Sequence, residues 1–151
     1  MAGLQWASSV ITEEIRDVLE TAHVSGDLKV VYYGDQERIP RTPAAAVMSG
    51  PRTRDFNQTG IQYEIMFDTH ILVYHGLIQD LATLTKTSEE LVETLEATMH
   101  LTANRKLPDS GDPRIVHGYI SSVEPGFAQR GKALFVVHRM THTSRSRQVI
   151  S

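Results

Sequence analysis

The sequence predicts an α+β fold, with a mostly antiparallel sheet of about five strands and two or three helices packed on one face. Three observations predict it. Helix-like and strand-like segments follow one another in the order helix, three strands, helix, two strands. Residues 61–74 read as one long β-strand that no Gly or Pro interrupts. The last two strand-like segments flank turn residues typical of a hairpin.

Composition is that of an ordinary globular protein. The 151 residues are 40% hydrophobic and 22% charged, which predicts one domain over residues 1–142 and a mobile polar tail over 143–151. The formal net charge of −3 excludes the basic surface of a dedicated DNA-binding protein. Without cysteine the chain forms neither disulfides nor thiolate metal sites. Its N-terminus lacks a secretory signal, so we expect folding in the cytosol.

The first helix begins at Ser8 or Ser9, either of which can cap it, and runs to about His23. A turn follows, and residues 28–33 then form a short strand of β-branched and aromatic side chains. Apolar residues at helical spacing mark the helix face that packs on the sheet: Ile11, Ile15, Val18, Leu19 and Ala22.

The second strand, residues 44–49, consists mainly of small side chains and follows a connection that Pro40 and Pro43 hold extended. Residues 50–60 then form a polar loop rich in turn-forming residues. About 2–5 residues suffice for a hairpin loop. The excess length therefore predicts that this loop contacts another molecule.

Positive charge gathers around the two Pro-containing connections, at Arg38, Arg41, Arg52 and Arg54. As a nucleic-acid surface the group lacks interleaved aromatic residues apart from Phe56. Arginine and aromatic side chains are enriched at protein contacts. We therefore expect Arg52, Arg54 and Phe56 to meet a protein partner with an acidic surface, and a solvated loop is the plain alternative.

The long strand, residues 61–74, exceeds what a small domain needs. At ~3.3 Å per residue it would extend roughly 45 Å, whereas an ordinary strand has about 5–6 residues. Its side chains alternate between an apolar and a polar face until Leu72 and Tyr74 make the far end apolar on both sides. One core does not cover so long a strand, so we expect Leu72 and Tyr74 to contact another subunit.

The second helix is predicted from a capping box at residues 87–90, Thr-Ser-Glu-Glu. The preceding residues 77–84 also show helical spacing. Their pattern fits either a short helix or an apolar loop and does not distinguish the two. The closing hairpin then joins strands at 114–123 and 132–142, with a turn from Glu124 and a tip through Gly131. The apolar stripe of the second helix is Leu91, Val92, Leu95 and Met99.

Candidate chemistry is sparse. His138 and His142 point the same way on a predicted strand, but four strand positions separate them by roughly 13 Å, too far for one metal ion. Glu64 and Asp68 have the same separation, which favours a polar sheet face over an acid–base pair. Phosphate-binding and nucleophile-elbow motifs do not occur. We expect no catalytic residue, no cofactor and no metal.

The chain resembles the tail terminator (tail completion) proteins of long-tailed bacteriophages. The resemblance covers residues 10–140 and rests on order and spacing. It includes the first helix VITEEIRDVLETA, the Pro-flanked strand IPRTPAAAVMSG and the long strand IQYEIMFDTHILVYH. The acidic-capped helix SEELVETLEATM and the closing hairpin IVHGYISSVEPGFAQRGKALFVVHRM complete it.

This resemblance implies a structural virion protein at the head-proximal end of the tail. It would form a ring, usually a hexamer, that caps the tail tube, stops its polymerisation and joins it to the head or neck. The implied partners are further copies of the chain, the tail tube protein and the head/neck connector protein. DNA would pass through the lumen without specific binding, which an acidic net charge suits.

Three other classes stay open. A neck or head–tail connector ring is the nearest alternative, a tail tube subunit is further away, and a small hydrolase built on the histidines and carboxylates is remote. Oligomeric state separates them, because a closed ring favours terminator or connector, an open tube favours the tube protein, and a monomer favours the enzyme. Without an apolar run near the ~20 residues that cross a bilayer, no membrane contact is expected.

Overall fold

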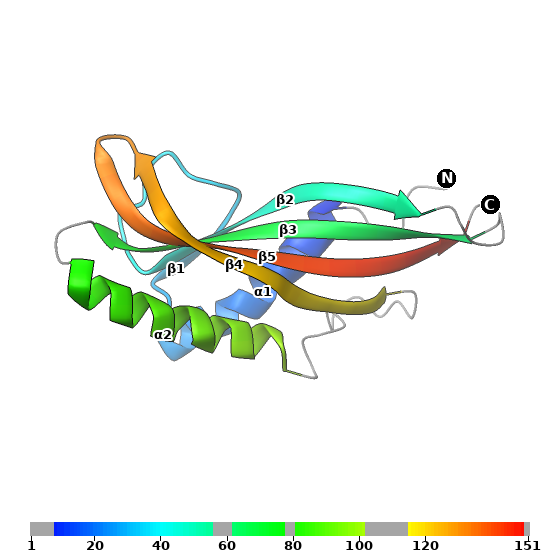
Figure 1. The fold of residues 1–151 in the computed structure, drawn as a ribbon, viewed down its shortest axis with the longest axis horizontal. Coiled ribbons are helices and arrows are strands. Elements are labelled where there is room, and N and C mark those ends of the chain that lie inside the picture. The colour runs from blue at the N-terminus through cyan, green and yellow to red at the C-terminus, as the bar shows by residue number, and fades with distance from the viewer. Residues whose placement is uncertain (1–7, 56–61, 78–80, 102–114, 150–151) are drawn as a thin grey trace.

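The structure, a computed structural model, describes residues 8–55, 62–77, 81–101 and 115–149 of the chain. Its elements follow the predicted order and form the predicted α+β fold (Figure 1). In chain order they are α1 (Ser8–Ser25), β1 (Val30–Tyr33), β2 (Ala44–Asp55), β3 (Gln62–Leu77), α2 (Leu81–Met99), β4 (Ile115–Arg130) and β5 (Ala133–Val149).

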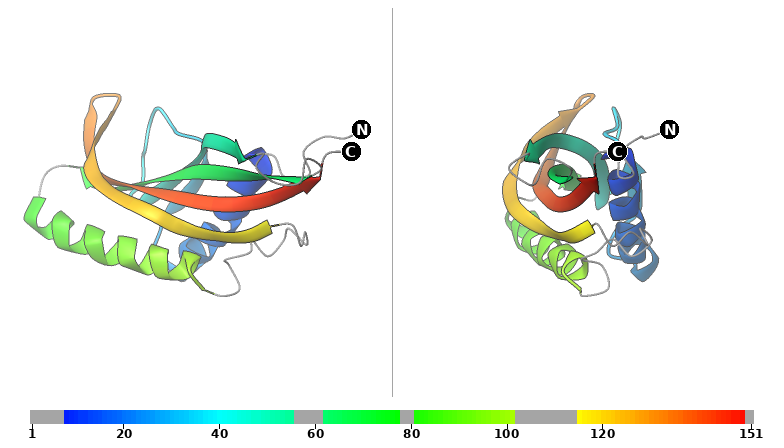
Figure 2. Two further views of the ribbon diagram at one scale, coloured as in Figure 1. Left: turned by 45° about the vertical axis from the view of Figure 1, so that its right-hand side comes forward. Right: turned by 90° about the vertical axis from the view of Figure 1, so that its right-hand side faces the viewer.

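The strands form one five-stranded mixed sheet in the order β1-β2-β3-β5-β4. β1 runs parallel to β2, and the other neighbouring pairs are antiparallel. β3 and β5 are the long central strands and pair along nearly their whole length, with one irregularity between Tyr74 and Gly76. The sheet is strongly twisted, so that its outer strands curve around the central pair (Figure 2).

Both helices pack on one face of the sheet, as predicted. The first helix lays Ile11, Ile15 and Leu19 against the sheet, and each of these side chains is fully buried. The second helix adds Val92, Leu95 and Met99 to the same cluster. Alternate residues of the strands complete this core, because every second side chain of a strand faces the helices. They include Val47, Ile65, Phe67, Ile71, Val73 and Met140.

A second, smaller cluster lies on the opposite face at one end of the sheet. Its centre is Tyr74 of β3, which is fully buried and meets Phe135 of β5 in a T-shaped ring contact at 5.5 Å between centroids. Ile39, from the connection between β1 and β2, covers the cluster, and Ala44 and Ala46 of β2 form part of it. The end of the sheet is therefore closed by a connection and a hairpin, without a helix.

Strand β2 is longer than predicted, and the expectation of a loop over residues 50–60 is wrong for its first half. After an irregularity between Ser49 and Arg52, residues 52–55 pair with residues 64–67 of β3. The irregularity brings Gly50 so close to β3 that a side chain does not fit. A Cβ at this position would lie 2.7 Å from His70 Nε2 and 2.8 Å from the Asp68 carbonyl oxygen. Residues 56–61 lie outside the described part of the chain.

Strand β5 is also longer than predicted. The expectation of a mobile tail from Thr143 onward is wrong for residues 143–149, which pair with residues 62–68 of β3. Their Ser, Thr and Arg side chains look like a tail in the sequence, yet the backbone of the long neighbour strand supplies the hydrogen bonds that hold them. The domain therefore continues to Val149.

The second helix begins earlier than the capping box predicts. Leu81 is its first residue, so residues 87–90 lie inside it, and the Ser88 hydroxyl donates to the Thr85 carbonyl at 2.9 Å. The open question over residues 77–84 is thereby answered at both ends: Leu77 closes β3, and residues 81–84 are helical. Residues 78–80 lie outside the described part.

The closing hairpin is confirmed, but its turn lies later than predicted. β4 continues through Glu124-Pro125-Gly126, and Arg130 pairs directly with Ala133 across a two-residue turn. Gly131 has a φ of 63°, in the left-handed region that glycine adopts without steric cost. Pro125 is tolerated because β4 is an edge strand, where a missing backbone N–H need not break a ladder.

Candidate functional site

The structure does not bring the sequence-predicted interface residues together. Arg52 is exposed and pairs with Phe67, at the far end of β2 from Ala44, which pairs with Tyr74. Arg54 follows on the same strand, and its side chain and all of Phe56 lie outside the described part. Leu72 is half-buried on the sheet face without helices.

Tyr74 corrects the sequence prediction most clearly. It was expected to be left uncovered by the core, but its exposed fraction is 0% within the single chain. Its hydroxyl donates to Asp35 Oδ1 at 2.6 Å, so both its ring and its polar atom find partners inside the fold. The sequence pattern could not show this, because Asp35 is 39 residues away and reaches Tyr74 only after the β1–β2 connection folds over the sheet.

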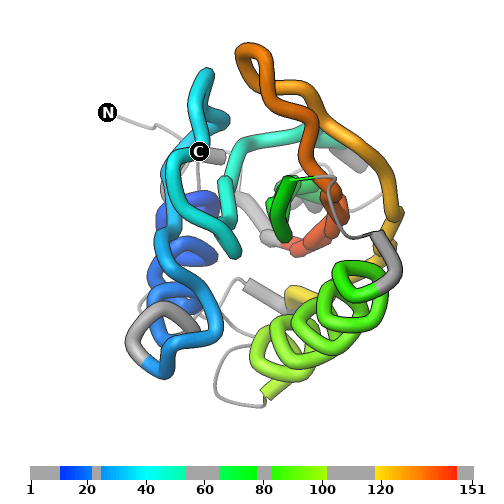
Figure 3. Tube along the Cα trace, turned by 90° about the vertical axis from the view of Figure 1, so that its left-hand side faces the viewer, coloured from blue at the N-terminus to red at the C-terminus, as the bar shows by residue number. Residues whose placement is uncertain are grey.

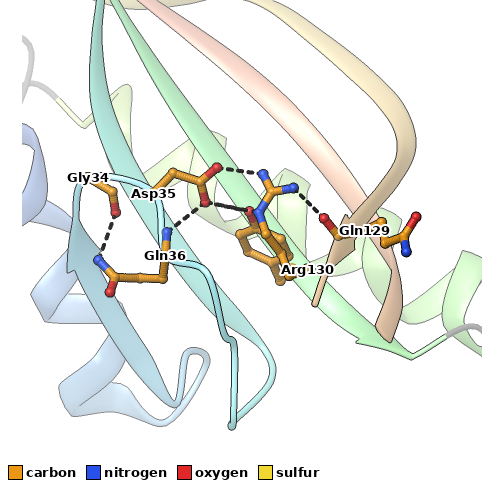
Figure 4. A network of polar contacts seen from close by, with 6 residues as sticks. Gly34, Asp35, Gln36, Gln129 and Arg130 are labelled. Atoms are coloured by element: carbon orange, nitrogen blue, oxygen red, sulfur yellow. Dashed lines mark hydrogen bonds and ion pairs between the residues drawn. The ribbon is translucent and has the colours of Figure 1, made fainter. Parts of the chain in front are cut away.

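A polar network ties that connection to the hairpin (Figure 4). Arg130 forms an ion pair with Asp35 through Nη2 and lies over the Tyr74 ring, 5.5 Å from its centroid. The backbone N–H of Gln36 donates to Asp35 Oδ1 at 2.9 Å, and Arg130 Nη1 donates to the Gln129 carbonyl at 2.8 Å. The network fixes the two segments beside each other across 95 residues of sequence.

The electrostatics of the network follow from these contacts. Burial raises the pKa of Tyr74, and the hydrogen bond to Asp35 raises it further. Burial opposes ionisation of Asp35, but the hydrogen bonds from Tyr74 and Arg130 outweigh it and hold the pKa of the carboxyl below its usual value. Asp35 is therefore a carboxylate and Tyr74 a neutral hydrogen-bond donor at neutral pH.

A cavity of about 590 Å³ opens beside the network, between the connection and the tip of the hairpin. Arg38, Arg130 and Lys132 line it, and no acidic side chain does so among the described residues. Its remaining lining residues, including Ile39, Pro40 and Phe135, make its floor apolar. Such a cavity suits a carboxylate carried on a partly apolar segment.

The open edge of β4 is the second notable surface. Among the described strands β4 pairs only with β5, so one edge of a 16-residue strand has no strand neighbour. Two large side chains of β4 reach solvent on opposite faces of the sheet, Tyr119 at 50% exposure on the helix-free face and Phe127 at 59% exposure beside α2. The Ile120 N–H of β4 donates to His100 Nε2 at 2.9 Å, and the rest of such an edge is a template for pairing with another chain.

Neither sequence motif nor spacing pointed to these two surfaces. Arg130 and Lys132 flank Gly131. A turn in which two basic residues flank a glycine was a sequence signal for the basic cavity. Tyr119 and Phe127 fell within or just after a predicted strand, but only the sheet order shows that this strand lies at the edge.

Away from the Tyr74 cluster, the sheet face without helices is polar, as expected. Thr143 Oγ1 donates to Asp68 Oδ1 at 2.9 Å and lies 2.8 Å from Ser121 Oγ. Thr141 Oγ1 lies 3.3 Å from His70 Nδ1. Asp68 is thus engaged by the Thr143 hydroxyl.

Two histidines meet on the helix-covered face, which the sequence did not predict. His75 Nε2 and His138 Nδ1 lie 2.9 Å apart, because the irregularity after Tyr74 turns His75 toward β5. Burial, together with the neighbouring His138, lowers the pKa of His75 to about 4, and burial also lowers the pKa of His138. The pair is neutral at neutral pH and shares one hydrogen bond.

His138 also lines a cavity of about 260 Å³ together with Ser88 and Glu89. The Ser88 hydroxyl donates to a helix carbonyl, however, and no hydrogen bond joins it to His138 in the described structure. Within the described ranges no three His, Cys, Asp or Glu side chains gather as metal ligands would. The cavity therefore lacks the nucleophile–base contact that nucleophilic catalysis by serine requires.

His142 is fully buried further along β5. Neither of its ring nitrogens has a hydrogen-bond partner among the described groups. Burial, together with the neighbouring His100, lowers its pKa to about 4. His142 and His138 do share a face, as the sequence predicted, but only His138 has a hydrogen-bonded partner, His75, among the described groups.

No protein-family model matches this chain, and a search of curated proteins finds no match. Of the two described helices, neither is apolar enough over a sufficient length to cross a bilayer.

Proposed function

We propose that this protein is a structural subunit that assembles into a closed ring, the tail terminator of a long-tailed bacteriophage. The observation that carries the proposal is the open edge of β4, with Tyr119 and Phe127 exposed along it. The resemblance of the sequence to tail terminators supplies the identity of the ring. The element order on which that resemblance rests is the order of the fold.

An open strand edge supports assembly for a physical reason. Its backbone N–H and C=O groups gain partners when another chain pairs with or covers them, and exposed aromatic side chains gain apolar contact at the same time. A ring closes every such contact without leaving a free end, whereas an unclosed repeat would continue as a filament. A subunit that must stop polymerisation needs the closed form.

The remaining partners follow from the proposed role. The ring would cap the tail tube protein on one side and meet the head/neck connector protein on the other. DNA would pass through the lumen, and a net charge of −3 disfavours its retention there. Arg52, exposed on the last part of β2, remains the proposed contact to an acidic neighbour, now on a strand end rather than in a free loop.

A head–tail connector ring is the alternative that shares all of these features. The small hydrolase has one observation in its favour, the presence of Ser88 and His138 in one cavity. The hydrogen bond from Ser88 to its own helix counts against it.

The proposal is tested by the mass of the purified protein in solution. Light scattering after gel filtration at micromolar concentration should give one closed oligomer, and negative-stain microscopy should show rings that bind the ends of isolated tail tubes. Phe127→Asp should weaken assembly, because a charge desolvated at an interface is costly. Leu101→Asp, at a side chain that is 57% exposed just after α2, is the matched control.

Each outcome has a consequence. A monodisperse wild-type monomer would overturn the ring. Open tubes would favour the tail tube subunit, and rings that bind neck proteins but ignore tube ends would favour the connector.

A further inference from the structure

Two surfaces of opposite charge lie on opposite sides of the molecule. The first, the basic hairpin end, comprises Arg38 and Lys132 at the cavity beside Arg130. The second, the acidic helix face, comprises Glu90 and Glu93 on α2.

The basic hairpin end carries charge that the fold leaves uncompensated. Arg130 is paired with Asp35, but Arg38 and Lys132 are exposed and form no ion pair within the described part of the chain. Both line a cavity with an apolar floor, which is wide enough at about 590 Å³ to admit side chains of another segment. A carboxylate entering this cavity would meet two cations without competing for the Asp35 contact.

The acidic helix face is equally uncompensated. α2 contains four glutamates and one lysine. Its buried side, with Val92 and Leu95, faces the core, so Glu90 and Glu93 point away from the sheet and are exposed. Neither forms an ion pair with a residue that the structure describes.

The two surfaces are placed so that they do not meet within one chain. Seen from the end of the molecule, the tip of the β4–β5 hairpin lies at the top and α2 at the bottom (Figure 3). Figure 1 shows the same separation from the side. Two complementary surfaces at separate places on one molecule allow a head-to-tail contact between copies, which closes into a ring when the rotation per subunit permits.

We propose that the acidic helix face of one subunit docks on the basic hairpin end of the next, with glutamate carboxylates entering the cavity between Arg38 and Lys132. This inference rests on the proposed ring and names a second contact in it, in addition to the β4 edge. A second copy is the occupant because each surface supplies the charge that the other lacks, and both belong to every chain. A foreign acidic partner would use only one of them.

The test reverses each surface in turn. R38E/K132E and E90K/E93K place like charges at every contact, so the protein concentration at which rings half-assemble should rise by about tenfold or more. Arg130 is left unchanged because it holds the Asp35 network. The matched control is E13K/D17K on α1, where both side chains are exposed and the change in charge equals that of E90K/E93K. It should assemble as the wild type does.

Recovery of the ring separates a lost contact from a lost fold. Mixing the two double variants in equal amounts should restore rings, because each basic surface then meets an acidic surface on the alternate chain. The quadruple variant should form rings alone, since both surfaces are exchanged on every copy. Wild-type rings should also dissociate as salt rises, because exposed charges are screened.

The outcomes distinguish this inference from the proposed function. A wild-type ring that survives both reversals, or two reversed variants that fail to form rings when mixed, would overturn the contact and leave the ring standing. A wild-type monomer would overturn both proposals together.

Discussion

The helix-covered face and the hairpin end of this sheet are stabilised in different ways. The core of the helix-covered face is apolar, with Ile15, Phe67 and Leu95 fully or almost fully buried between helices and strands. The hairpin end is held by one buried tyrosine and the ion pair of Asp35 with Arg130. The first region is complete within the chain, whereas the second leaves cations and a strand edge available. This difference indicates where partners bind.

The largest difference in stability between the two regions is expected when the same side chain is removed from a buried and from an exposed position. Phe67→Ala, at 1% exposure, should cost about 3–5 kcal/mol of unfolding free energy through lost contacts and a cavity. Phe127→Ala, at 59% exposure, should leave the unfolding free energy of the monomer almost unchanged. Urea denaturation of both variants measures the difference. Equal losses would mean that β4 is covered within the single chain.

Low pH should reduce the stability that the helix-covered face contributes to the fold. The pKa of His142 is about 4 in the folded chain against 6.5 for an ordinary histidine, so the unfolded state binds more protons between these values. Stability contributed by the neutral ring is therefore complete above pH 6.5 and is lost as pH falls toward 4, by on the order of 3 kcal/mol. His75, also with a pKa of about 4, should act in the same direction.

The variant His142→Leu checks this assignment. Leucine fills the site with an apolar side chain and has no group that binds a proton. Its unfolding free energy should fall less steeply than that of the wild type between pH 6.5 and 4. An unchanged slope would assign the acid sensitivity to other groups.

At the hairpin end, Tyr74→Phe removes a single hydroxyl and so tests the polar network alone. Asp35 would lose the donor at 2.6 Å, which should cost about 1–3 kcal/mol of unfolding free energy. The apolar packing of the ring on Phe135 would remain. Tyr32→Phe is the control on β1, because the Tyr32 hydroxyl has no hydrogen-bond partner within the described ranges. A loss equal to that of the control would show that the network does not hold the hairpin.

The smallest effect is expected for the exposed ion pair on the outer surface. Arg139 Nη2 lies 2.9 Å from Glu124 Oε2, but both side chains are about half exposed to solvent. Arg139→Ala should change the unfolding free energy by about 0–1 kcal/mol, since solvent screens such pairs. A larger loss in calorimetry would mean that this pair belongs to a contact between chains.

The site was only partly predictable. Arg52 was expected to be accessible and is exposed, whereas Tyr74 was expected at an interface and lies in the core. Arg130 and Lys132 were not singled out, because their role depends on the β1–β2 connection lying beside the hairpin tip. That proximity joins segments about a hundred residues apart, which no local pattern encodes.

The sequence by itself determined the order of the elements and the faces of the helices. Ile11, Ile15, Val18 and Leu19 repeat at helical spacing and are all buried, because a helix side is fixed by local geometry alone. Tertiary structure decided where the strands end. Residues 52–55 and 143–149 resemble loop and tail, yet β3 is long enough to pair with both. A strand lasts as long as a neighbour offers hydrogen bonds, and that neighbour is known only once the chain has folded.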